Sequence, residues 1–151
     1  MHQGRDASLI RQTARDRARE LMLSCAGVLT PAEAHALLQC GAILIDVRTK
    51  AELEWVGRVP GGVNVEWNTW PGRKPNPEFL AQLAEHADKD DTVMFLCRSG
   101  GRSQSAALAA TQAGYAECYN ILEGFEGDKD AGHHRNTVGG WRFRGLPWIQ
   151  G

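Results

Sequence analysis

Short apolar runs alternate with longer amphipathic segments along this chain. Residues 42–47 (AILIDV) and 92–96 (TVMFL) are almost continuously apolar, as strands are when both faces of a sheet are covered. A third run covers residues 116–121, and the stretch 59–65 (VPGGVNV) reads as a turn followed by a brief strand. Helical patterns separate these runs, so the sequence predicts an α/β fold with a central, mainly parallel sheet flanked by helices.

Capping and stop residues set the bounds of the predicted helices. Thr30, Pro31 and Glu33 suit the cap, the first position and the third position of a helix. This helix is expected to end before Gly41. Further helices are expected at residues 51–56, from 76 to 83, and over 103–113.

The first part of the chain has a weaker pattern. Apolar residues form an uneven stripe over residues 8–24, among Arg, Asp and Glu side chains, which predicts a helix. This helix packs either on its own domain or on a partner, and we favour its own domain. The chain is therefore divided into a helical extension, residues 1–26, and one α/β domain, residues 27–151.

The overall composition excludes several classes of partner. The 151 residues include 17 basic and 18 acidic ones, a net charge of −1, which offers no general surface for nucleic acid or for a membrane. No apolar run approaches the roughly 20 residues of a membrane span, and charges interrupt the N-terminus where a secretory signal has its apolar core. We therefore expect a cytoplasmic protein.

Four cysteines occur without a CxxC pair and without the Cys/His spacing of a zinc site. No metal site is predicted, and the thiols are expected to be free in a reducing compartment. Cys40 and Cys118 read as buried, inert thiols.

Cys97 has a setting of its own, directly after the apolar run 92–96. The predicted loop consists of Cys97, Arg98, Ser99, Gly100, Gly101, Arg102 and Ser103. Two glycines let the backbone curl so that several N–H groups point inward as an anion nest, and the following helix adds its positive N-terminal end. With two arginines nearby, this setting favours the thiolate, so Cys97 is the candidate nucleophile without any metal or cofactor.

Four stretches give the sequence a resemblance to a known family. They are IDVRTKAELEWVGRVPGGVNV, CRSGGRS with the following SAALAATQAGY, NILEGFEG and GGWRFRGLPW. In this order they resemble the rhodanese-like domain in its single-domain sulfurtransferase form. The resemblance implies a five-stranded α/β sheet and a persulfide formed on Cys97, with residues 98–102 as the loop around it. Asp46 and Arg48 match an Asp-x-Arg pair that is mainly structural in the family.

Two departures from the family pattern bear on the substrate. Arg58 stands where the family usually has a histidine, and residues 127–138 (GDKDAGHHRNTV) form an insertion. The insertion is either surface decoration or part of the substrate rim. In the second interpretation His133, His134 and Arg135, together with Arg58, select an anionic or thiol substrate.

The function that the resemblance implies is sulfur transfer. A small anionic donor such as thiosulfate gives sulfur to Cys97, and cyanide, glutathione or a protein thiol removes it. The alternative is a persulfide relay or redox-signalling module with a protein partner, for which the tryptophan-rich stretch 67–77 offers a docking edge; core packing and a surface rim are the simpler interpretation of that stretch. Related phosphatases and arsenate reductases resemble this fold but have five residues between Cys and Arg, where this chain has four.

Overall fold

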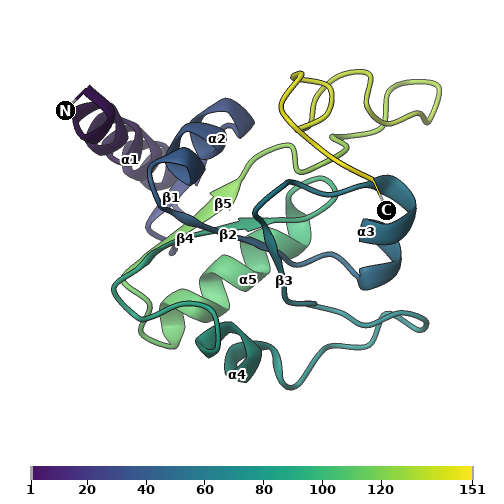
Figure 1. Cartoon of the computed structure of the whole chain (residues 1–151), viewed down its shortest axis with the longest axis horizontal. Coiled ribbons are helices and arrows are strands. Elements are labelled where there is room, and N and C mark those ends of the chain that lie inside the picture. The colour runs from purple at the N-terminus through teal and green to yellow at the C-terminus, as the bar shows by residue number, and fades with distance from the viewer. Residues whose placement is uncertain (1, 151) are drawn as a thin grey trace.

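A single parallel sheet forms the centre of the molecule. The computed structural model describes the backbone of residues 2–150 and the side chains of residues 6–150. Its strands are β1 (Gly27–Leu29), β2 (Ile43–Asp46), β3 (Val63–Asn64), β4 (Thr92–Leu96) and β5 (Glu117–Ile121). They lie in the order β1-β5-β4-β2-β3, and every pairing is parallel (Figure 1). The predicted α/β fold with a five-stranded sheet is confirmed.

Both faces of the sheet are covered, which explains why its strands read as continuous apolar runs. The helices are α1 (His2–Glu20), α2 (Pro31–Gln39), α3 (Lys50–Val56), α4 (Phe79–Ala84) and α5 (Gly101–Gln112). In β4, Val93 and Phe95 join the core beneath α4 and α5, whereas Met94 and Leu96 join the core on the other face. That second core includes buried residues of α1, α2 and the segment that follows β5 (Figure 1).

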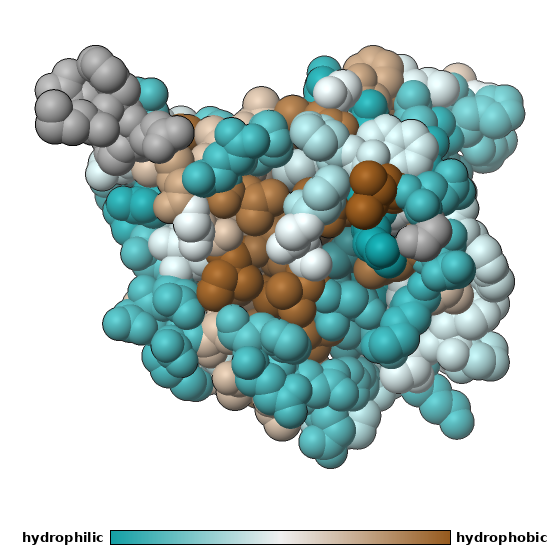
Figure 2. Space-filling model, viewed as in Figure 1, coloured by the Kyte–Doolittle hydropathy of each residue, from teal (hydrophilic) through white to brown (hydrophobic). Residues whose placement is uncertain are grey.

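Some apolar residues beside the second core stay partly exposed. Figure 2 shows a group of apolar residues in the middle of the side turned toward the viewer, with hydrophilic residues around it. Partly buried side chains that pack against this core include Leu38, Ala42 and Val56. None of the helices in residues 2–150 is long and apolar enough to cross a membrane.

Capping residues next to the first turn define where two of the helices begin. Thr30 and Glu33 form the predicted capping box of α2, with Pro31 at the first helical position. A second capping box, between Thr49 and Glu52, starts α3, which begins one residue before the predicted helix. Because each box satisfies backbone N–H groups that have no partner within the helix, these boundaries depend on nearby residues alone.

The helix α1 and the strand β1 form one end of the fold. Ala7, Ala14 and Ala18 of α1 are buried, and Arg15 binds Glu117 of β5 with 2.9 Å between Nη2 and Oε1. The strand β1 was not predicted from the hydrophobic pattern. It has three residues, and its Gly27 lies so close to β5 that an added Cβ would be 2.6 Å from the ring of Tyr119. Pairing with β5, rather than any local pattern, makes this segment a strand.

A buried ion pair lies at the carboxyl end of β2. The guanidinium of Arg48 binds the carboxylate of Asp46 through two contacts of 2.9 and 2.7 Å, and it also donates to the carbonyl of Gly57 at 2.9 Å. Its Cζ lies 4.2 Å from the centre of the Phe125 ring. The side chains of Arg48 and Asp46 are only 0% and 3% exposed, so each charge depends on the other.

Removing the negative charge of this pair should destabilise the fold. We expect Asp46→Asn to lower the free energy of unfolding by roughly 3–5 kcal/mol, because it leaves the buried guanidinium without a counter-charge. Urea unfolding of the two proteins measures the difference. Lys50→Gln, which removes the exposed Lys50–Glu66 pair, is the control and should cost less than about 1 kcal/mol. A loss of less than about 1 kcal/mol in Asp46→Asn would contradict the assignment.

Candidate active site

The loop that follows β4 is held in place through its own backbone. The N–H of Phe125 donates to the carbonyl of Cys97 at 2.8 Å, and the N–H of Glu126 donates to the carbonyl of Arg98 at 2.9 Å. The N–H of Gly127 reaches the same carbonyl of Arg98 at 3.2 Å. The turn after β5 therefore fixes the first two residues of the loop.

Glycines allow this close approach. A Cβ added to Gly124, which has a φ of +66°, would be 2.4 Å from the carbonyl carbon of Arg98 and 2.5 Å from the nitrogen of Ser99. Gly100 precedes α5 with a φ of +119°, a conformation that other residues rarely adopt. The predicted tight curl of the Cys97 loop is thus present, and it ends where α5 begins.

The sulfur of Cys97 lies beneath the loop, and the residue is 1% exposed. The N–H of Gly100 donates to Sγ at 3.1 Å, and the hydroxyl of Ser103 lies 3.2 Å from it. That hydroxyl also donates to Oδ1 of Asn120 at 2.6 Å. The single proton of the Ser103 hydroxyl is thus directed to Asn120, and the N–H of Gly100 is the donor at Sγ. A hydrogen bond donated by a backbone N–H suits a negatively charged sulfur.

Asn120 was missed in the sequence, although a signal for it was present. It is a polar residue in the otherwise apolar strand β5, it is 4% exposed, and such a group needs hydrogen-bond partners. Its partners are Ser103 and the carbonyl of Gly100, the latter at 3.3 Å from Nδ2. Asn120 therefore connects β5 to the loop and to the first turn of α5.

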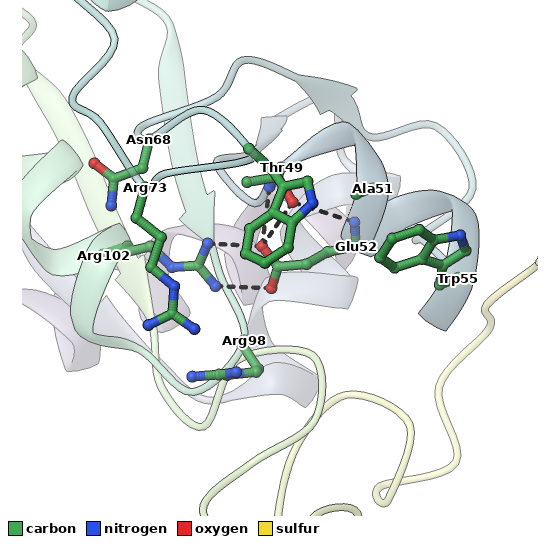
Figure 3. Close-up of a pocket in the computed structure, with 9 residues that line it drawn as sticks. Thr49, Ala51, Glu52, Trp55, Asn68, Arg73, Arg98 and Arg102 are labelled. Atoms are coloured by element: carbon green, nitrogen blue, oxygen red, sulfur yellow. Dashed lines mark hydrogen bonds and ion pairs between the residues drawn. The ribbon is translucent and has the colours of Figure 1, made fainter.

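The two arginines of the loop line a cavity of about 460 Å³ at its mouth (Figure 3). Arg102 is held there by Glu52 of α3 in a two-pronged contact, with N–O distances of 2.7 and 2.9 Å. Arg98 has no such partner among residues 6–150, and its Nε is buried without a hydrogen bond. The described residues that line the cavity are Thr49, Ala51, Glu52, Trp55, Asn68, Trp70, Arg73, Arg98 and Arg102.

The pair of Glu52 and Arg102 stays charged over a wide pH range. Burial by itself raises the pKa of Glu52, but hydrogen bonds from Arg102 and from the N–H of Thr49 outweigh it and bring the pKa down to about 2. The pKa of Arg102 is raised, first by its hydrogen bonds to Glu52 and also by the nearby Cys97 and Asp46 when they are negative. This ion pair is therefore a fixed part of the cavity wall beside the loop.

The third arginine of the cavity was not predicted. Arg73 belongs to the stretch 67–77, which the sequence suggested as core packing, a surface rim or a docking edge. Figure 3 shows the Arg73 side chain directed toward the space beside Arg98. Trp67 does pack in the core, with its ring 5.0 Å from that of Phe79, whereas Trp70 is 52% exposed at the cavity. One stretch thus contributes both to the core and to the cavity wall.

The residues expected at the substrate rim lie elsewhere. Arg58, His133, His134 and Arg135 are all absent from the described residues that line the cavity. The backbone of Arg58 pairs with Ile149 in an antiparallel bridge, which holds the C-terminal segment. His133 and His134 are exposed, and Arg135 donates to the carbonyl of Gly127 at 2.7 Å. None of these four residues therefore lines this cavity, and their role at a substrate rim stays a prediction.

Hydrogen bonds to Asp130 hold the insertion 127–138 in a local turn. The carboxylate of Asp130 accepts the N–H groups of Gly132 and His134 at 2.8 and 2.9 Å and the hydroxyl of Thr137 at 2.7 Å. These bonds satisfy the turn locally, and they lower the pKa of Asp130. The geometry therefore favours the interpretation as surface decoration.

The remaining cysteines differ in exposure. Cys118 is buried, and burial raises its pKa to about 11, which makes it a poor nucleophile at neutral pH. Cys25 is also buried. Cys40 is exposed, so the interpretation of this residue as a buried thiol was wrong.

One group of acids in the described chain has ligand atoms close enough to share a metal ion. The carboxylates of Asp88, Asp90 and Asp91 lie within 4.8 Å of one another on the turn before β4. Exposed acidic groups of this kind are common without a metal. Cys97 follows the opposite end of β4, so this cluster takes no part in the chemistry of the loop.

Comparisons with known proteins agree with this geometry. The rhodanese-like domain matches residues 30–131 of the chain. An uncharacterized protein of Rickettsia conorii is 37% identical over 110 residues, which are 71% of this chain and 82% of that protein. Thiosulfate sulfurtransferase 16, chloroplastic, of Arabidopsis thaliana is 35% identical over 94 residues, which are 61% of this chain and 78% of the relative.

A solved structure is also similar. The crystal structure of Rv0390 from M. tuberculosis has a TM-score of 0.78 and 45% sequence identity, and the match covers 85% of this chain and all of that one (100%). The resemblance seen in the sequence is therefore confirmed. The chain belongs to the rhodanese-like domain family, whose members include thiosulfate sulfurtransferases.

The Glu52–Arg102 pair should make stability depend on pH in a defined window. Because the pKa of Glu52 falls from 4.5 to about 2 on folding, its contribution is complete above pH 4.5 and is lost as the pH falls towards 2. This amounts to at most about 3 kcal/mol. Urea unfolding at a series of pH values should therefore show a smaller acid-dependent loss in Glu52→Gln, in which the glutamine still suits the capping box.

The control for this measurement is Glu54→Gln, an exposed position on the same helix. It should keep the pH dependence of the wild-type protein. If Glu52→Gln loses as much stability as the wild type across this window, the carboxylate of Glu52 is not the group responsible.

Proposed function

We propose that this protein is a sulfurtransferase that carries sulfane sulfur as a persulfide on Cys97. The observation that carries the proposal is the position of Sγ, which receives the N–H of Gly100 at 3.1 Å under a loop whose Arg98 and Arg102 line the adjacent cavity. Membership of a family that includes thiosulfate sulfurtransferases supports the same reaction. We place it in the cytoplasm, where thiols stay reduced.

In the first step the thiolate of Cys97 attacks the outer sulfur of thiosulfate. A bond forms between Sγ and that sulfur, the S–S bond of thiosulfate breaks, and sulfite leaves with the electron pair. The positive charge of Arg98 favours the arrival of the anionic donor. The N–H of Gly100 contacts Sγ and so stabilises the attacking thiolate; once sulfite has left, the negative charge lies on the outer sulfur of the persulfide.

In the second step a thiophilic acceptor attacks the outer sulfur of the persulfide. With cyanide, a C–S bond forms, the S–S bond breaks, thiocyanate leaves and Cys97 returns to the thiolate. Glutathione or a protein thiol reacts in the same way as a thiolate and leaves as a persulfide. The two steps need no cofactor or metal, because each nucleophile supplies the electron pair of the new bond and each leaving group takes the pair of the broken bond.

The site is less suited to phosphoryl transfer. Four residues separate Cys97 from Arg102, and both prongs of the Arg102 guanidinium are occupied by Glu52. A phosphate group would need that guanidinium for its own oxygens and would also meet the carboxylate of Glu52 at the cavity wall.

The persulfide can be detected directly. After incubation with thiosulfate, intact mass spectrometry should show an increase of one sulfur, about 32 Da, which dithiothreitol or cyanide removes. Cys97→Ser should abolish the increase. The matched controls Cys25→Ser, Cys40→Ser and Cys118→Ser should retain it. An adduct that persists in Cys97→Ser would refute the proposal.

The phosphatase alternative can be tested in the same preparation. We expect turnover of p-nitrophenyl phosphate to be negligible beside sulfur transfer to cyanide, because of the shorter loop and the occupied Arg102. The two rates are measured side by side, with Cys97→Ser as the background. Robust phosphatase turnover that depends on Cys97 would reverse the order of the two functions.

A further inference from the structure

The hydroxyl of Ser103 has three acceptors around it but only one proton. Its oxygen lies 2.6 Å from Oδ1 of Asn120, 3.1 Å from the carbonyl oxygen of Gly100 and 3.2 Å from Sγ of Cys97. These neighbours come from β5, from the loop and from the end of β4, the strand beside β5, and they meet where α5 begins (Figure 1). A hydroxyl donates one hydrogen bond, so the three acceptors compete for it.

The side-chain amide of Asn120 decides which acceptor receives the proton. Its Nδ2 donates to the carbonyl of Gly100 at 3.3 Å, and that carbonyl also accepts the N–H of Gln104 at 3.2 Å. The amide has one favourable orientation, because in the reverse one its oxygen would face the carbonyl oxygen, which is also an acceptor. Oδ1 therefore faces Ser103, in the shortest of the three contacts. Asn120 is 4% exposed, so its Oδ1 needs this donor.

A lone pair of the Ser103 oxygen is left to face Sγ of Cys97. With the proton directed to Asn120, this lone pair can accept the S–H of a Cys97 thiol across the 3.2 Å contact. It offers no hydrogen bond to a thiolate, which needs donors. The N–H of Gly100, at 3.1 Å, is the donor that contacts Sγ directly. Ser103 therefore assists the neutral form of the cysteine and leaves the charged form to the backbone.

We propose that Asn120 is a positioning residue that directs the Ser103 proton away from the Cys97 thiolate. The thiolate then accepts one hydrogen bond fewer, and its electron pair stays more available for attack. A thiolate that is stabilised further forms at lower pH but is a weaker nucleophile, since nucleophilicity falls as basicity falls. The effect on sulfur transfer rests on the proposed function, whereas the direction of the Ser103 hydrogen bond does not.

The two steps of sulfur transfer should respond to this hydrogen bond in opposite directions. In the first step Sγ is the nucleophile, and its electron pair forms the bond to the outer sulfur of the donor. In the second step Sγ is the leaving group, and the pair of the broken S–S bond returns to it. A hydrogen bond donated to Sγ slows the first step and assists the second. By preventing that bond, Asn120 favours the loading of sulfur over its release.

Charged groups on the surrounding elements also act on the sulfur. They are Arg98 in the loop, Arg102 at the start of α5, Glu52 on α3, Asp46 and Arg48 at the end of β2, and Glu123 and Glu126 in the turn after β5. Most of them form ion pairs with one another or with Arg144. Substitutions at Asn120 and Ser103 change none of these charges, so a difference between such variants reports the hydrogen bonds at Sγ.

The ionisation of Cys97 provides the direct test. The ultraviolet absorbance of the thiolate is followed against pH, and the absorbance of Cys97→Ser in the same background is subtracted. In Asn120→Leu the Ser103 proton is free to turn to Sγ, so the profile should move to lower pH by roughly one unit. Ser103→Ala should move it in the same direction by less, because the thiol loses its acceptor while the thiolate loses no donor. Ser105→Ala, which removes an exposed hydroxyl of the same helix, should leave the profile unchanged.

A double variant shows whether Asn120 acts through Ser103. Once the hydroxyl is absent, adding Asn120→Leu to Ser103→Ala should produce no further shift. An equal shift in that background would mean that Asn120 acts through the carbonyl of Gly100 alone, which contradicts the inference. An unchanged profile in Asn120→Leu contradicts it too. If Asn120→Leu does not fold, the sign for Ser103→Ala decides, since a shift to higher pH is the result of a hydroxyl that donates to the thiolate.

Single-turnover kinetics test the consequence for sulfur transfer. At a pH where Cys97 is fully ionised in both proteins, loading from thiosulfate should be about two- to threefold slower in Asn120→Leu than in the wild type. Release to cyanide should be faster by a similar factor. Damage to the loop would slow both steps, and that result would overturn the inference. If the wild type forms no persulfide, the proposed function fails, but the absorbance profiles still decide where the Ser103 proton is directed.

Discussion

A single buried cation connects the parts of the fold that position Cys97, the candidate nucleophile. The guanidinium of Arg48 contacts Asp46 at the end of β2, the carbonyl of Gly57 after α3, and the ring of Phe125 in the turn after β5. The N–H of Phe125 in turn holds the carbonyl of Cys97. Because a buried charge without partners is very costly, none of these segments can move away while the domain stays folded. Arg48, which does not contact the sulfur, therefore helps to hold the Cys97 loop in place through Phe125.

Glu52 connects the start of α3 with the wall of the cavity. One carboxylate completes the capping box with Thr49 and binds both prongs of Arg102. This contact fixes Arg102 beside the loop and neutralises its charge. Arg98 and Arg73 are the cations of the cavity that form no ion pair with residues 6–150. A polar group placed in advance costs little reorganisation when a charged substrate arrives. The same ion pair therefore shapes the electrostatics of the cavity and anchors a helix.

The sequence by itself determined the features that depend on neighbouring residues. The bounds of β4 and the capping box of α2 were both predicted as the structure has them. The position of the loop after β4 was predicted, but α5 begins at Gly101, two residues before the predicted helix. The Asp46–Arg48 pair lies two residues apart, so its contact was foreseeable too. In each case the relevant contacts span only a few residues, and local propensity is enough to predict them.

Only the tertiary structure decided which distant segments meet. The strand β1 exists because Gly27 fits against Tyr119 of β5, a contact that no local pattern encodes. Arg73 lines the cavity and the histidines of the insertion do not, although both stretches were interpreted from the sequence as a possible rim. The residue types of a loop determine which chemical groups it carries. The direction in which those groups point is set by packing between residues far apart in the chain. The sequence therefore determined the candidate nucleophile and the position of its loop, and the tertiary packing decided what surrounds them.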